Sequence, residues 1–104
     1  MVELRRFSRA PLALSVEFTV DGGEGRFAGH ARDISVGGMF VETTRAPDHN
    51  AKIVVHLTFA GQKAPFSLPA VVRWVNTDGM GLQFGLLGAR ETHAITEVIR
   101  THEP

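Results

Sequence analysis

Apolar and polar residues alternate along most of this chain, in short runs separated by segments rich in glycine, proline and asparagine. The clearest run covers residues 12–20, where every second side chain is a leucine, a valine or a phenylalanine. A period of two is typical of a β-strand that buries one face and exposes the other. We therefore predict a half-buried strand with Leu12, Leu14, Val16, Phe18 and Val20 on its inner face.

Five further strand-like runs follow, over residues 26–34, 39–41, 52–59, 66–74 and 80–86. In the run over residues 66–74, the pattern places Trp74 on the same face as Val72, in the core or at its rim, and Arg73 on the opposite face. Pro69 in that run predicts an edge position or a bulge, because proline cannot donate a hydrogen bond to the ladder. In the last run, Gly81 and Gly85 face away from the apolar side and leave room for another group to approach.

The period changes after Gly88, where apolar residues take the spacing of one stripe of an amphipathic helix. These residues are Ala94, Ile95, Val98 and Ile99. No crossover helices separate the strand-like runs, which excludes a parallel βαβ sheet. We predict a mainly all-β fold, a six-stranded antiparallel barrel whose C-terminal helix covers one opening, because closure removes exposed sheet edges. Residues 1–10 form an N-terminal arm in this interpretation, and residues 11–104 form the barrel domain.

Length and composition narrow the class of protein. A chain of 104 residues with 43% hydrophobic and 21% charged residues fits one globular domain. The chain has no cysteine and no apolar run long enough to span a bilayer, so we expect a cytoplasmic protein without membrane insertion. The formal net charge is zero, from 11 basic and 11 acidic residues, which argues against a general DNA- or RNA-binding role.

Two short motifs carry the candidate chemistry: Arg5-x-x-x-Arg9 in the arm, and Asp33-x-Ser35-x-x-Gly38 between two strand-like runs. A guanidinium can bond a phosphate through two parallel N–H donors, and the same geometry fits O6 and N7 of guanine. Asp33 offers acceptors for the N1–H and N2–H₂ donors of guanine, and the Ser35 hydroxyl can donate or accept. Gly38 permits a turn or a close backbone approach that a Cβ atom would obstruct. The two motifs together suit a ligand that carries both phosphate and a purine edge.

In this order and at this spacing, the two motifs resemble the signature of the PilZ domain family, whose members are bacterial receptors for cyclic di-GMP (c-di-GMP). The runs over residues 71–75 and 79–84 resemble the fifth and last strands of that family. The resemblance implies that the PilZ-type barrel binds cyclic di-GMP through Arg5, Arg9, Asp33, Ser35 and Gly38. Secondary candidates are Leu4, Arg6, Gly37, Arg73 and Trp74. Leu4 occupies the position thought to influence whether one or two nucleotides bind.

The resemblance further implies a receptor without catalysis or cofactor, in signalling that governs motility or biofilm formation. The arm would fold over the ligand, and the newly ordered surface would engage an effector protein. One alternative is a PilZ-fold interaction module of the pilus or motility machinery that binds no nucleotide. The other is an enzyme acting on cyclic di-GMP. Against the enzyme, the five histidines are scattered over different elements, without the spacing of a metal site.

Overall fold

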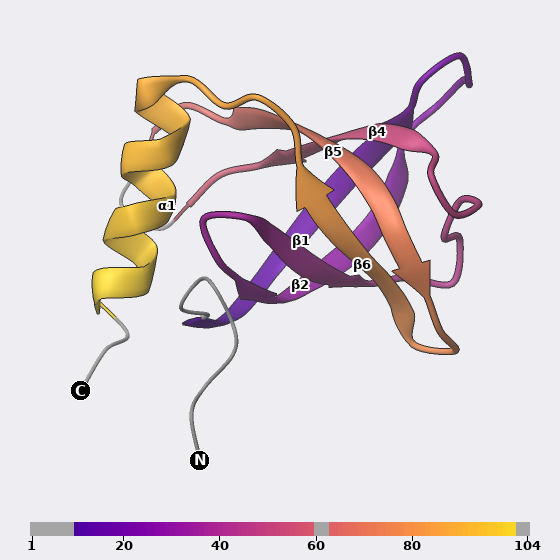
Figure 1. Ribbon diagram of the computed structural model, residues 1–104, viewed down its shortest axis with the longest axis horizontal. Helices are drawn as coiled ribbons and strands as arrows, with labels where there is room; N and C mark the ends of the chain where they lie inside the picture. The colour runs from indigo at the N-terminus through magenta and orange to yellow at the C-terminus, as the bar shows by residue number, and fades with distance from the viewer. Residues whose placement is uncertain (1–9, 60–62, 102–104) are drawn as a thin grey trace.

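The computed structural model describes residues 10–59 and 63–101, which form six strands followed by one helix (Figure 1). The strands are β1 (Ala10–Val20), β2 (Phe27–Ile34), β3 (Gly38–Glu42), β4 (Lys52–Leu57), β5 (Phe66–Val75) and β6 (Gly79–Phe84), and the helix is α1 (Ala89–Thr101). All neighbouring strands are antiparallel, and β1 pairs with both β2 and β4. The sheet therefore closes in the order β1-β2-β3-β6-β5-β4, which confirms the predicted barrel.

The barrel interior holds the apolar side chains of the alternating runs. The largest fully buried ones are Phe18, Phe66, Ile34, Met39, Leu68 and Met80. Helix α1 lies beside one end of the barrel (Figure 1), and its buried Ala94, Ile95 and Ile99 belong to the same apolar cluster as the strand residues. The predicted helix stripe is thus confirmed, and one continuous core joins helix and sheet.

The strand ladder is irregular at three places. The irregularities fall between Pro11 and Leu14 in β1, between Ala31 and Asp33 in β2, and between Val72 and Trp74 in β5. A bulge adds one residue to a strand and turns the following side chains toward the other face. As a result, the consecutive residues Arg73 and Trp74 are both exposed, and Arg32 is exposed directly beside the half-buried Asp33.

The face predicted for Trp74 is therefore wrong. Val72 is buried and pairs with Leu82, so an unbroken ladder would have placed Trp74 opposite Met80, inside the barrel. Instead Trp74 pairs with Gly81, and its side chain is 48% exposed on the outer wall.

Two further details at the ends of β5 and β6 differ from the sequence interpretation. Pro69 pairs regularly with Val54, without a bulge, in a strand that has a neighbour on each side. The carbonyl of Pro69 accepts a hydrogen bond from Gly85 N at 2.8 Å, just beyond the end of β6. The N–H and C=O groups of a strand residue point to the same side. The N–H group that proline lacks would therefore face a point where β6 has already ended. Leu86 follows that end and is 96% exposed, rather than continuing the inner face.

Candidate functional site

The motif Asp33-x-Ser35-x-x-Gly38 forms the tight turn between β2 and β3. Ser35 N donates to Gly38 O at 2.8 Å, and Ser35 Oγ accepts from the backbone N–H groups of Gly37 and Gly38 at 3.2 and 3.1 Å. The Ser35 side chain is only 4% exposed. Its hydroxyl oxygen is therefore engaged in shaping the turn, as serine side chains often are in such positions.

Gly38 has a clear packing reason to lack a side chain. A Cβ atom at this position would lie 1.9 Å from Leu82 O of the paired strand β6, a separation at which the backbone would have to shift. The neighbouring Gly37 O accepts from Phe84 N at 2.9 Å, which ties the turn to the end of β6. The close backbone approach expected at Gly38 is thus present.

Asp33 lies beside the bulge in β2 with its carboxylate held in place. Its Oδ1 accepts from Phe40 N of β3 at 3.2 Å. The side chain lines a cavity of about 580 Å³ on the outer wall of the barrel. The walls come from β1, β2, β3, β5 and the β5–β6 turn: Ala10, Pro11, Arg32, Asp33, Phe40, Trp74, Asn76 and Asp78. This size falls within the usual range for small-molecule sites.

Aromatic rings form one side of this cavity. Phe40 and Trp74 stack with their centroids 5.2 Å apart and their planes at 25°. Gly81 lies between them in the sheet, and a Cβ atom there would come within 2.1 Å of the indole, so the absent side chain makes room for Trp74. The close approach predicted at Gly81 is confirmed, and it leaves an exposed indole surface on which a planar base could stack.

The β5–β6 turn contributes two polar residues to the wall of the cavity. Asn76 Oδ1 accepts from the backbone N–H groups of Asp78 and Gly79 at 2.8 and 3.0 Å, which fixes the turn. Asp78 and Asn76 line the cavity. Asn76, Asp78, Arg32 and Phe40 were not among the site residues predicted from the sequence. The only signal in the sequence is the position of Arg32 directly before the motif residue Asp33 and of Phe40 two residues after Gly38.

The remaining candidates divide into two groups. Arg73 is exposed and donates to the side chains of Gln83 and Asn50, but it does not line the cavity. Leu4, Arg5, Arg6 and Arg9 lie outside the described residues. The described chain begins at Ala10, which lines the cavity together with Pro11.

A second, smaller depression of about 330 Å³ lies around His56, Glu17 and Arg26. The two ring nitrogens of His56 lie 3.1 Å from the hydroxyls of Thr19 and Ser67. Burial of the ring, with a further contribution from the charge of Arg26, lowers the pKa of His56 below its ordinary value. Among residues 10–59 and 63–101, no three histidine or acidic side chains gather closely enough to hold a metal ion, and no helix is long and apolar enough to cross a bilayer.

The closed barrel, its terminal helix and the cavity beside the β2–β3 turn define a class of small single-barrel domains. The chain belongs to the PilZ domain family, whose family model matches residues 3–100. This match covers both sequence motifs, all six strands and the helix up to Arg100. No curated protein matches the chain.

Several solved structures share the fold. The PilZ domain of YcgR from Escherichia coli with c-di-GMP superposes with a TM-score of 0.77 at 12% identity, over 96% of this chain and 92% of that one. The PilZ domain of CeSA from a cellulose-synthesizing bacterium gives 0.74 at 16% identity, over 90% and 96%. The MrkH–c-di-GMP complex of K. pneumonia gives 0.71 at 19% identity, and this chain spans only about half of it (96% and 52%).

Proposed function

We propose that this protein is a cyclic di-GMP receptor without catalysis of its own. The observation that carries the proposal is the composition of one cavity. Asp33, the first residue of the second motif, lines this cavity together with Ala10 and Pro11. Ala10 and Pro11 directly follow Arg9, the last residue of the first motif. Folding therefore brings the second motif to the place where the arm with the first motif joins the barrel.

The chemistry of the cavity suits guanine better than a purely anionic ligand. The Asp33 and Asp78 carboxylates repel bare phosphate, but a carboxylate accepts favourably from the N1–H and N2–H₂ donors of guanine. In this proposal Asp33 accepts hydrogen bonds from one guanine, Trp74 provides a surface on which a base stacks, and Arg5 and Arg9 bind phosphate. Ser35, Gly37 and Gly38 contribute by holding the turn that positions Asp33.

The fold relatives support the ligand. The solved structures of the YcgR PilZ domain and of MrkH contain c-di-GMP on the same fold. Together with family membership, these structures support cyclic di-GMP as the ligand of this chain.

The output in this proposal is a population shift. Ligand stabilises the state in which the arm covers the cavity, and that newly formed surface engages an effector protein. Since ligand changes the equilibrium only by its differential affinity for the two states, partner affinity and ligand affinity must rise together.

Isothermal titration calorimetry with cyclic di-GMP tests the proposal. Wild type should bind, and Arg9→Ala and Asp33→Ala should each lose about 1.5–3 kcal/mol, the usual range for a hydrogen bond to a charged group. Asp21→Ala, which removes an exposed carboxylate in the β1–β2 turn, should bind like wild type. Absence of binding heat from wild type at tens of micromolar ligand would overturn the proposal and favour an interaction module that binds no nucleotide.

A further inference from the structure

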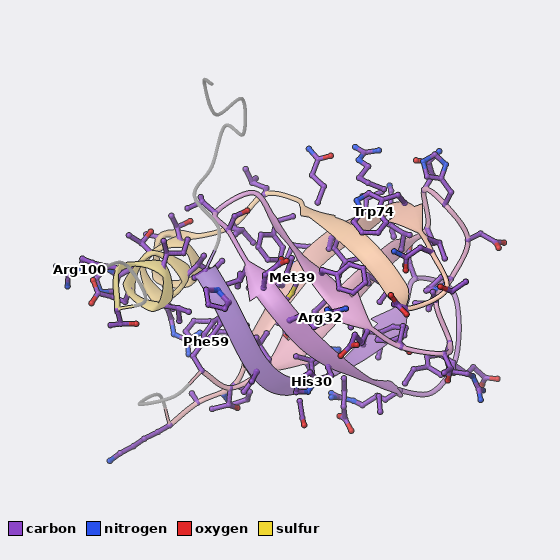
Figure 2. All side chains as sticks on the ribbon, turned by 90° about the horizontal axis from the view of Figure 1, so that it is seen from below. His30, Arg32, Met39, Phe59, Trp74 and Arg100 are labelled. Atoms are coloured by element: carbon purple, nitrogen blue, oxygen red, sulfur yellow. The ribbon has the colours of Figure 1, made fainter. Side chains whose placement is uncertain are left out.

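Arg32 belongs to neither motif, yet it lies on the wall of the cavity beside Asp33. The bulge between Ala31 and Asp33 explains this position, because it allows Arg32 and Asp33 to reach the same outer wall although they are consecutive in the strand. Figure 2 shows Arg32 on the barrel wall, with Trp74 toward the end that lies away from α1. A permanent cation therefore lies among the cavity residues of the described chain.

The Arg32 guanidinium makes two contacts within the described residues. Its Nη1 lies 3.5 Å from Glu42 Oε2 on the neighbouring strand β3. Its central carbon lies 5.6 Å from the centroid of Phe40, the ring that stacks on Trp74. Guanidinium, phenyl and indole thus form one row along the aromatic side of the cavity, and Glu42 contacts the guanidinium from β3, the strand that also carries Phe40.

The ion pair of Arg32 with Glu42 is weaker than the interaction that Arg32 could make with a phosphate group. The side chains of Arg32 and Glu42 are 52% and 43% exposed, and ion pairs in such positions gain little because water and salt screen them. A phosphate can accept two parallel N–H donors from the same guanidinium, which is a stronger and more directional interaction. The aromatic row keeps the guanidinium beside the space a ligand would fill.

We propose that Arg32 is a further ligand-binding arginine, and that Glu42 holds it until a phosphate of the ligand displaces the carboxylate. This inference rests on the proposed function, since it assigns a third phosphate-binding arginine to the same site. Glu42 is then a competitor of the ligand, and removing its charge raises affinity. Gain of affinity is an informative result because a damaged fold would not produce it.

The chain offers a matched control pair. Arg26 and Glu17 form an ion pair of 3.0 Å with side chains 53% and 56% exposed, around the second depression rather than the cavity. Glu17→Gln removes the same charge from a comparably exposed strand position, so it controls for the general effect of net charge on an anionic ligand. Arg26→Ala serves Arg32→Ala in the same way.

Calorimetric titration of the full chain with cyclic di-GMP tests the inference. We expect Arg32→Ala to weaken binding about tenfold and Glu42→Gln to tighten it roughly threefold, with Arg26→Ala and Glu17→Gln close to wild type. In the Arg32→Ala background, Glu42→Gln should no longer change affinity, because the competed group is absent.

The double variant Arg32→Ala/Glu42→Gln distinguishes two effects of Glu42: competition with the ligand for Arg32, and direct electrostatic repulsion of the ligand. If Glu42→Gln tightens binding equally with and without Arg32, the carboxylate acts on the ligand directly and the inference is wrong. It is also wrong if wild type binds while Arg32→Ala and Glu42→Gln leave the affinity unchanged, an outcome that keeps the proposed function intact. If wild type itself does not bind cyclic di-GMP, the proposed function and this inference fall together.

Discussion

At the scale of single residues, Ser35 shows how a motif position serves the architecture of the site. It is the one buried polar side chain within residues 10–59 and 63–101, and its hydroxyl is hydrogen-bonded to the turn that it belongs to. No buried side-chain nitrogen or oxygen in that part of the chain lacks a partner. The serine is therefore needed to hold the turn, whether or not its hydroxyl also reaches a ligand.

Replacing this residue tests that interpretation. Ser35→Ala leaves the buried N–H group of Gly38 and the half-buried N–H group of Gly37 without their acceptor, which should lower the free energy of unfolding by about 1–3 kcal/mol. Urea denaturation measures the change. Ser15→Ala, at an exposed position of β1, should stay within about 0.5 kcal/mol of wild type. Equal stability of the two variants would show that the Ser35 hydroxyl does not hold the turn.

Sequence reasoning found the motif residues but not all of the cavity. Asp33, Ser35 and Gly38 are recognisable because carboxylate, hydroxyl and glycine occur at a specific spacing. Arg32 is not recognisable in this way. The alternation of its strand correctly predicts that Arg32 faces solvent, but it gives no sign that a cavity lies there. The contact with Glu42 depends on strand register, which the pattern of one strand does not contain.

At the scale of elements, the bulge in β5 decides where the tryptophan lies. The period-two pattern holds from Phe66 to Val72, and these inner-face residues are buried as predicted. It fails at Trp74 because one extra residue enters the strand, and a shift by one residue exchanges the two faces. Gly81 on β6 then makes room for the indole. A bulge of this kind leaves no mark in the alternation itself, so the face of Trp74 was not predictable from one sequence.

Gly81→Ala tests the role of that space. The added Cβ would lie within 2.1–2.5 Å of the indole and should displace Trp74 from its stack on Phe40. We expect altered tryptophan emission and weaker binding of cyclic di-GMP, measured by fluorescence and calorimetry.

Gly85→Ala is the matched control, because its added Cβ meets neighbouring atoms only at 3.7–3.8 Å. It should leave both the emission and the affinity unchanged. If Gly81→Ala also behaves like wild type, the packing of Trp74 against Gly81 has no part in the site.

At the scale of the whole molecule, closure of the barrel assembles the cavity. Its walls come from β1, β2, β3 and β5, which are separated in sequence but neighbour one another around the barrel or through β6. The barrel and its covering helix were predictable, because strand-like runs without crossover helices leave few antiparallel arrangements. The cavity was not, because its shape depends on bulges and on the β5–β6 turn, where Asn76 and Asp78 line the cavity.

In the proposed function, cyclic di-GMP binds in the cavity between Asp33 and Trp74. Tryptophan emission tests this claim most directly, since Trp74 is the one tryptophan of the chain and there is no tyrosine. Titration with cyclic di-GMP should change the emission saturably, with the dissociation constant found by calorimetry, and Asp33→Ala should move the midpoint of this change to a ligand concentration about ten- to hundredfold higher. Binding heat without any change in Trp74 emission would place the ligand elsewhere on the protein and contradict this account.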